Sequence, residues 1–372
     1  MKTRTRIPIA KPLITDEEKR RVLEVLESGR LVAGAQVRAF EEAFAGYLGV
    51  KFAAATSSGT TALQVALEAM EIKPGDAIIT TPFTFVATSN AILHAGARPV
   101  FVDVDARTFN LDPNQVEDAV RRERARAILC VHLYGLPADL GAFSDIAARH
   151  SILLIEDCAQ AHGAAIEGRK AGTIGHVGIF SFYPTKNMTT GEGGMVVTAR
   201  EDVAHRAAVL VNVGQNGSEE YVYERIGYNY RLTEMAAAMG LAQLERLEER
   251  NASRRSNAAR MTAAFAGLPW LLPPAEPAGY HHVYNQYTVR VPDAREALVR
   301  HLAARGVGSR VYYPQLIPHS PAYRALGYGG SFPVAEQLTK QVLSLPVHPA
   351  LSDEDVAWII ESVRQFPHGE RA

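Results

Sequence analysis

Short apolar runs alternate with amphipathic stretches between about residues 50 and 200. Runs rich in Val and Ile that continue without a polar face are typical of strands buried on both sides. Predicted strands cover residues 52–56, 77–81, 98–103, 127–133, 152–156, 177–182 and 194–198, and predicted helices cover residues 60–70, 86–94 and about 140–149. Buried strands separated by helices imply an α/β domain around a mostly parallel sheet.

The pattern changes in the last third of the chain. Proline-rich residues 268–279 interrupt the periodicity, and amphipathic elements lie on either side of them. The predicted elements are a single long helix at 232–250, a strand at 284–291 and helices at 294–305 and 353–366. We therefore predict a large domain over residues 1–250 and a smaller α+β C-terminal domain over residues 251–372.

Composition and charge narrow the class of protein. The 372 residues are 47% apolar and 21% charged, which is an ordinary globular composition. Lys and Arg (39) nearly cancel Asp and Glu (40), and this balance argues against a basic surface for nucleic acids or anionic membranes. No apolar stretch is long enough for a membrane span or a signal peptide. Cys130 and Cys158 lie inside apolar runs, as in proteins of a reducing compartment, so we expect a cytoplasmic protein.

Three segments combine residue types that suit binding or catalysis. The first, residues 56–63 (TSSGTTAL), lies between a predicted strand and a predicted helix. Small hydroxyl residues and a glycine at a helix N-terminus leave backbone N–H groups free, and such an arrangement binds phosphate. An ordinary N-cap with a tight turn is the alternative.

The second segment, residues 155–163 (IEDCAQAHG), ends a predicted strand. Ligands collect at the carboxyl ends of strands in open α/β sheets. Asp157 could pair there with a protonated ring nitrogen, and Gln160 could reach a neighbouring polar atom. A helix cap is the alternative for Asp157, and we expect Glu156 and His162 to be structural.

The third segment, residues 180–195 (FSFYPTKNMTTGEGGM), follows another predicted strand. Its glycines allow the chain to turn sharply. Lys186 lies in this loop, and lysine is the side chain that condenses with a carbonyl to form a Schiff base. An ordinary surface lysine is the alternative. We expect no metal in this site.

A phosphate turn, then a strand-end Asp with Gln three residues on, then a Lys about thirty residues later is the order found in fold-type I pyridoxal 5′-phosphate (PLP) enzymes. The chain resembles the DegT/DnrJ/StrS family of PLP-dependent sugar aminotransferases over nearly its whole length. The matching segments are SSGTTAL, TPFTFVATSNAI, RPVFVDVDARTFNLDP, VHLYGLPADL, IEDCAQAHGA, FSFYPTKNMTTGEGGM, GYNYRLTEMAAAMGLAQL and LSLPVHPALSDEDV. The resemblance implies the fold-type I aminotransferase fold, with a large PLP-binding domain and a smaller C-terminal domain.

The resemblance also implies a role for individual residues. Lys186 would form the Schiff base with PLP, Asp157 would pair with the pyridine nitrogen, and Gln160 would bond the ring's 3-oxygen. The other implied cofactor contacts are Gly59, Thr60 and Ser181 at the phosphate, Phe85 stacked on the ring, and Asn229, with Arg231 as a second candidate, at the phosphate held by a neighbouring subunit. Such shared sites require a homodimer. Core packing is the alternative for Phe85, and an exposed polar loop is the alternative for Asn229.

The resemblance implies L-glutamate as the amino donor, a nucleotide-linked keto-sugar as the acceptor and pyridoxamine phosphate as the form between the two half-reactions. The loop residues Thr189, Thr190 and Glu192 resemble members that aminate C4 of a 4-keto-6-deoxy sugar. Tyr183 stands where many such members carry histidine, which weakens that assignment. The candidate substrate contacts are Tyr183 and, in residues 310–319, Tyr312, Tyr313 and His319.

Other functions remain open. The first is an aminotransferase acting on a 3-keto-sugar or a keto-cyclitol. The second is a PLP-dependent sugar dehydratase, in which histidine replaces the lysine, and the presence of Lys186 argues against it. The third is a non-catalytic regulator or DNA-binding protein, which would lack Lys186 or Asp157 or would add a basic patch; none of these features is visible in the sequence.

Overall fold

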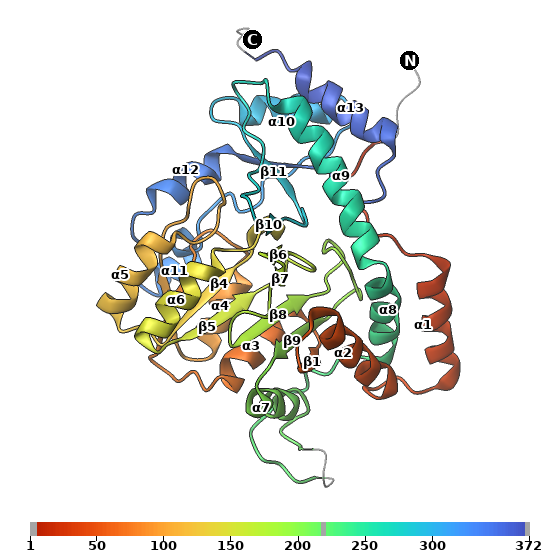
Figure 1. The fold of residues 1–372 in the computed structure, drawn as a ribbon, viewed down its shortest axis with the longest axis vertical. Helices are drawn as coiled ribbons and strands as arrows, with labels where there is room; N and C mark the ends of the chain where they lie inside the picture. The colour runs from red at the N-terminus through yellow and green to blue at the C-terminus, as the bar shows by residue number, and fades with distance from the viewer. Residues whose placement is uncertain (1–5, 217–220, 369–372) are drawn as a thin grey trace.

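A computed structural model describes residues 6–216 and 221–368. Its centre is a seven-stranded sheet with the strand order β1-β9-β8-β5-β4-β2-β3 (Figure 1). The strands are β1 (Phe52–Thr56), β2 (Ala77–Thr80), β3 (Arg98–Phe101), β4 (Ala127–Val131), β5 (Leu153–Asp157), β8 (Val177–Ser181) and β9 (Gly194–Thr198). The strand β9 runs antiparallel to the other six strands of this sheet. The predicted mostly parallel sheet is therefore confirmed.

Helices cover both faces of the central sheet. One face packs against α3 (Gly59–Ala69), α4 (Ala87–His94) and α7 (Glu201–Val211). The other face packs against α2 (Ala35–Leu48), α5 (Pro113–Glu123), α6 (Leu140–His150) and α8 (Glu234–Glu245). Neighbouring strand residues such as Ile78 and Ile79 enter opposite cores. Burial on both faces explains why the strands are continuous apolar runs.

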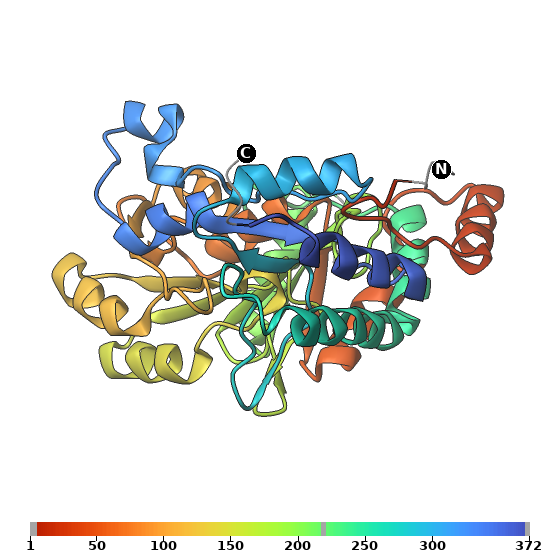
Figure 2. The same ribbon diagram turned by 90° about the horizontal axis from the view of Figure 1, so that it is seen from above.

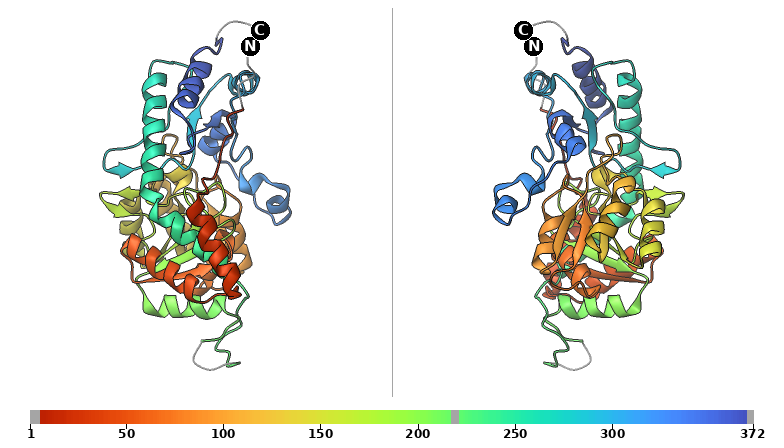
Figure 3. Two further views of the ribbon diagram at one scale, coloured as in Figure 1. Left: turned by 90° about the vertical axis from the view of Figure 1, so that its right-hand side faces the viewer. Right: turned by 90° about the vertical axis from the view of Figure 1, so that its left-hand side faces the viewer.

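The C-terminal elements form a second hydrophobic core. In Figure 2, α9 (Leu247–Phe265), α10 (Arg295–Ala304) and α13 (Asp353–Arg364) lie beside the two-stranded sheet of β11 (Tyr287–Arg290) and β12 (Val342–Leu345). The remaining elements are α1 (Asp16–Ser28), β6 (Ala165–Ile166), β7 (Arg169–Lys170), β10 (Tyr280–His281), η1 (Leu133–Gly135), η2 (Ile317–His319), α11 (Pro321–Ala325) and α12 (Pro333–Gln341). Ile7 joins the C-terminal core, so the described chain begins and ends at the same end of the molecule (Figure 3). None of the helices in the described ranges combines the length and the hydrophobicity that a bilayer span requires.

The single helix predicted at 232–250 is wrong. Arg246 has φ −112° and ψ 8°, and the chain bends there between α8 and α9. The bend lets α8 cover the large sheet while α9 continues into the C-terminal core (Figure 1). Because α9 runs through residue 250, the division into domains 1–250 and 251–372 stays a proposal.

Helix α1 buries only Glu18 and Val25, and its leucines Leu23 and Leu26 are about half exposed, so apolar packing contributes little to its position. Buried hydrogen bonds hold it in place instead. Glu18 accepts from the Thr15 N–H at 2.8 Å, from Gln243 Nε2 at 2.5 Å and from Arg250 Nη2 at 3.0 Å. A carboxylate thus joins α1 to both α8 and α9.

We predict that Glu18→Ala lowers the free energy of unfolding by about 3 kcal/mol, because it leaves the buried Arg250 guanidinium unpaired. Glu17→Ala is the matched control: its carboxylate is exposed and pairs with Arg20, so its loss should lower the stability much less than the loss of Glu18. Denaturant unfolding of both variants measures the difference. Equal losses would contradict the prediction.

Acid should weaken the same contact. Burial would raise the pKa of Glu18, but hydrogen bonds from Thr15 and Arg250 outweigh it and lower the pKa to about 2. The stabilisation is therefore complete above the unfolded-state value of 4.5 and falls as the pH drops from there toward 2.

Candidate active site

Lys186 lies in the turn that follows β8, where its backbone N–H donates to the Tyr183 carbonyl at 2.9 Å. Burial lowers the pKa of its amine to about 8, against the opposing charge of Asp157. An ordinary solvated lysine would keep its usual value of about 10.4. The lowered pKa does not suit an ordinary surface lysine, and about a tenth to a fifth of this amine is neutral near physiological pH.

The turn that carries Lys186 is anchored by three asparagines. Asn285 Nδ2 donates to the Thr185 carbonyl at 3.2 Å and to Asn187 Oδ1 at 2.9 Å. Asn187 Nδ2 donates to Asn251 Oδ1 at 2.7 Å and to the Val283 carbonyl at 3.0 Å. These bonds fix the residues on both sides of the lysine. No local pattern in the sequence pointed to Asn251 or Asn285.

Asp157 is the last residue of β5 and is 4% exposed. Its Oδ2 accepts from Thr88 Oγ1 at 2.8 Å, and its Oδ1 accepts from the Ala159 N–H at 3.1 Å. Burial raises the pKa of this carboxyl, and the Thr88 hydroxyl, the Ala159 N–H and the charge of Lys186 each oppose that rise. The loop after β5 leads to the strand β6 and not to a helix, so the helix-cap alternative fails.

Gln160 is buried and uses both ends of its amide. Its Oε1 accepts from the Tyr134 N–H at 2.7 Å, and its Nε2 donates to the Tyr313 hydroxyl at 2.8 Å. The Tyr134 and Tyr313 rings are stacked, with centroids 6.2 Å apart. Both residues have positive φ, 58° and 62°, a backbone region that bulky side chains rarely adopt. This strained pair orients Gln160 and brings Tyr313, a predicted substrate contact, beside it.

The first turn of α3 packs against Ser181. A Cβ atom on Gly59 would lie 2.6 Å from Ser181 Cβ and 2.9 Å from its Oγ, so only glycine permits this approach. Ser58 is the N-cap and accepts from the Thr61 N–H at 3.1 Å. The next two residues, Gly59 and exposed Thr60, begin the helix with N–H groups that have no carbonyl four residues before them within the helix. Gly59, Thr60 and Ser181 thus form a cradle that fits a phosphate group.

Two predicted cofactor residues have exposed side chains. Phe85 is 58% exposed, whereas nearby Phe83 is fully buried, so the core-packing alternative for Phe85 is wrong. Asn229 is exposed and pairs through its backbone with Asn212, whose Oδ1 accepts from Arg231 Nη1 at 3.1 Å. Neither side chain reaches Lys186 by a hydrogen bond within the described parts of this chain.

The candidate substrate contacts divide into two groups. Tyr312 lies beside Tyr313, with ring centroids 6.2 Å apart, and Tyr183, in the lysine turn, is 47% exposed. His319 pairs with the Gly330 carbonyl at 2.9 Å. Its ring also contacts Phe332, so His319 faces that neighbouring loop and not the residues around Gln160.

The loop after the lysine is tied to β8. Thr189 Oγ1 donates to the Phe182 carbonyl at 2.8 Å, and Thr190 Oγ1 donates to the Glu192 carbonyl at 2.7 Å. Both threonines are buried, while Glu192 is exposed. The threonines therefore shape the loop, and Glu192 is the member of this predicted group that is open to a ligand.

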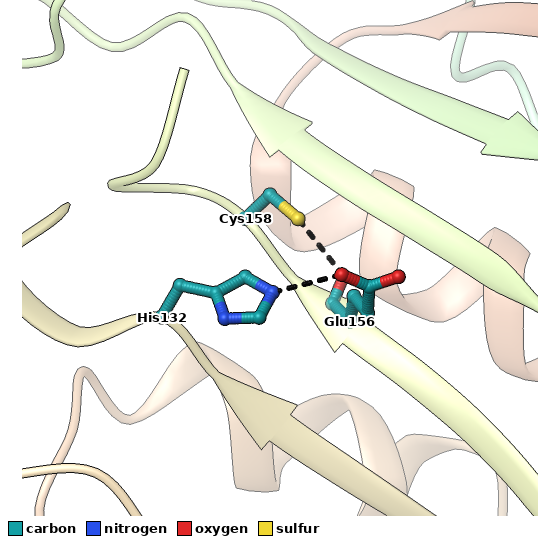
Figure 4. A group of neighbouring side chains, drawn as sticks. All are labelled: His132, Glu156 and Cys158. Carbon is teal, nitrogen blue, oxygen red and sulfur yellow. Dashed lines mark hydrogen bonds and ion pairs between the residues drawn. The ribbon is translucent and has the colours of Figure 1, made fainter. Parts of the chain in front are cut away.

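Glu156 lies on the opposite face of β5 from Asp157, in a group with His132 and Cys158 (Figure 4). Its carboxylate accepts from His132 Nε2 at 3.0 Å and from the N–H groups of Gly172, Ile174 and Gly175 at 2.7, 2.8 and 2.5 Å. His132 Nδ1 accepts from the Ala138 N–H at 2.9 Å. These hydrogen bonds satisfy the buried polar atoms of Glu156 and His132. The two side chains therefore stabilise the structure behind the site and do not form an open set of metal ligands.

Residues 12–364 match the model of the DegT/DnrJ/EryC1/StrS aminotransferase family. The chain belongs to this family. The resemblance inferred from the sequence is confirmed, and so is the assignment of the chain as an aminotransferase.

Two characterised relatives cover most of the chain. UDP-N-acetyl-3-dehydro-α-D-glucosamine 3-aminotransferase of Acidithiobacillus ferrooxidans is 42% identical over 96% of this chain and 95% of its own length. A protein of Geobacillus stearothermophilus named pleiotropic regulatory protein is 41% identical over 92% of each chain.

Solved structures share the fold closely. DesV of Streptomyces venezuelae, in complex with a ketimine intermediate, superposes with a TM-score of 0.92 at 38% identity and covers 98% of this chain and all of its own. The PLP form of the sugar aminotransferase Spr1654 of Streptococcus pneumoniae has a TM-score of 0.91 at 30% identity, over 96% of this chain and 97% of its own. The predicted fold-type I architecture is confirmed.

Thr88→Val should raise the pKa of Asp157 further, because it removes the hydroxyl that donates to the carboxylate without changing the volume of the side chain. We expect PLP to bind the apo protein about tenfold more weakly. Thr88→Ser, which keeps the hydroxyl, is the control. Reconstitution followed by fluorescence measures both dissociation constants, and wild-type affinity in the valine variant would refute a role for Thr88.

Proposed function

We propose that this chain transfers the amino group of L-glutamate to a nucleotide-linked keto-sugar with PLP as the carrier. The observation that carries the proposal is the placement of Lys186 and Asp157 at the carboxyl ends of the adjacent parallel strands β8 and β5, where their opposite charges influence each other. A phosphate cradle of Gly59, Thr60 and Ser181 lies on the same side of the sheet. PLP bound there would supply an aldehyde for the amine and an electron-withdrawing ring.

The residues of this chain have separate tasks in that reaction. Asp157, held by Thr88 and Ala159, would face the ring nitrogen of PLP as a carboxylate and would keep that nitrogen protonated. Lys186 Nζ accepts the proton from the α-carbon of the donor, which a neutral amine with a pKa of about 8 can do near physiological pH. Gln160 would hold an oxygen of the ring, and Phe85 would cover the face of the ring.

A second copy of the chain completes the site in this proposal. Phe85 and Asn229 are exposed, and the segment beyond α7 exposes Tyr221, Tyr223 and Ile226, the last at 95%. Exposed apolar side chains of this size favour burial in an interface. An isologous homodimer would bring Asn229 of each copy to the phosphate held by the other. The proposal also places the protein in the cytoplasm, without nucleic-acid or membrane partners.

Two positions on the sugar are candidates. The loop containing Thr189, Thr190 and Glu192 favours C4 of a 4-keto-6-deoxyhexose. C3 is the second candidate, because the 42%-identical relative from Acidithiobacillus ferrooxidans is named as a 3-aminotransferase. A regulatory function like that in the name of the Geobacillus relative is disfavoured, since the chain keeps both Lys186 and Asp157 in one site.

We predict that Lys186→Ala lowers the turnover number by about a thousandfold or more, because it removes both the covalent anchor and the proton acceptor. Lys170→Ala is the control, since Lys170 is also half-buried but bonds the Tyr47 carbonyl outside the site. The assay follows 2-oxoglutarate released from L-glutamate. Retention of wild-type turnover in the Lys186 variant would refute the proposed function.

The position is tested with matched 4-keto and 3-keto nucleotide sugars. We expect product only from the 4-keto substrate, with the new nitrogen on C4 by NMR. Turnover of the 3-keto sugar alone would replace C4 by C3 and leave the aminotransferase assignment intact. Salt-sensitive, sequence-specific DNA binding without turnover of either sugar would support the regulatory alternative.

A further inference from the structure

Arg254 is a buried cation without an acidic partner. It lies on α9 and is 6% exposed. Its Nη1 donates to the carbonyls of Tyr284 and Asn285, both at 3.3 Å, and its buried Nε has no hydrogen-bond partner. A buried guanidinium that is neither ion-paired nor fully hydrogen-bonded is strongly unfavourable.

The neighbouring arginines on α9 show the contrast. Arg250 pairs with Glu18 at 3.0 Å, and Arg255 pairs with Glu276 at 2.5 Å. No such pair includes Arg254 among the residues that the structure describes. Burial, and then the charge of Arg250, lower its pKa to about 10, which still leaves it charged at physiological pH.

Within the described ranges, none of the side chains that line the two small cavities beside Arg254 is a carboxylate. Lys11, on the segment that faces α9, adds a second cation at the exposed rim. His348 donates through Nε2 to the Pro8 carbonyl at 3.1 Å, and burial lowers its pKa to about 4, so it is neutral. The surroundings of Arg254 are therefore positive overall and suit an anion.

Arg254 faces two small cavities beside the active-site turn. The first is lined by Lys186, by Arg254 itself and by residues 10–13, which belong to no helix or strand. The second is lined by Arg254, Tyr312 and His348. Thr185 lines both cavities. The unpaired guanidinium of Arg254 and the active-site Lys186 therefore lie in the same region of the structure.

We propose that Arg254 binds a carboxylate of the amino-acid donor. This inference rests on the proposed function, because a donor whose nitrogen must reach the position of Lys186 Nζ carries its α-carboxylate only two bonds away from that nitrogen. An Arg guanidinium is the group that best matches a carboxylate, through paired N–H donors. The bound carboxylate would supply the negative charge that Arg254 lacks and a hydrogen-bond acceptor for its Nε–H group.

Calorimetric titration of the PLP-loaded protein with glutarate tests the site, since glutarate has the donor's carboxylates but no amine to react. Arg254→Met should weaken glutarate binding by about thirtyfold or more, because it removes the positive charge and the paired N–H donors of the guanidinium. Arg254→Lys should weaken it less. Arg260→Met, on the same helix but exposed and paired with Asp353, should bind glutarate like the wild type. Inorganic phosphate is titrated in parallel to identify a phosphate site.

Several results would overturn the proposal. Wild-type glutarate affinity in a folded Arg254→Met protein is one, and a loss of phosphate affinity without a loss of glutarate affinity is another. If Arg254→Met does not fold, Arg254→Lys decides, and unchanged glutarate affinity in it rejects the site. Failure of both variants to fold would assign Arg254 to the framework and would also reject it.

The carboxylate site at Arg254 and the proposed function can be refuted independently of each other. Glutarate binding needs no turnover, so a wild type that binds glutarate through Arg254 yet aminates no sugar would refute the proposed function alone. Sugar amination with an unchanged KM for L-glutamate in Arg254→Met would refute the carboxylate site alone.

Discussion

The site depends on the electrostatic balance between Lys186 and Asp157. Burial works against both charges: it lowers the pKa of the amine and raises that of the carboxyl, while each charge partly offsets the effect of burial on the other. The sheet topology makes this possible, because β5 and β8 are adjacent parallel strands and both residues follow their carboxyl ends. An acid and a base of intermediate strength are thereby held in one site.

The remaining features of the fold support this pair from two directions. The large sheet supplies the phosphate cradle and, through α4, the Thr88 hydroxyl that holds Asp157. The C-terminal elements supply Asn285, which anchors the lysine turn, and Tyr313, which holds Gln160. A change in how α9 and its partners pack on the large sheet would therefore reach the lysine turn through Asn251, which lies on α9 and bonds Asn187.

Much of the fold was predictable from the sequence, because strands buried on both faces leave continuous apolar runs. Helix α1 was missed, because charged residues dominate its sequence and buried hydrogen bonds of Glu18 hold it in place. The bend at Arg246 was missed for a related reason: the helical pattern continues through it, and only tertiary packing separates α8 from α9. Lys186 and Asp157 were identifiable because their order and spacing form a motif. Thr88, Asn285 and Arg254 were not, because their partners lie far away along the chain and no local pattern encodes such contacts.

Reduction with borohydride tests the central claim most directly. The PLP-loaded protein is reduced, digested and mapped by mass spectrometry to find the residue that carries the pyridoxyl group. The account predicts the label on Lys186 of the FSFYPTKNMTTGEGGM segment and its loss in Lys186→Ala. A label on a different lysine, or a protein that takes up no PLP when it is supplied, would contradict it.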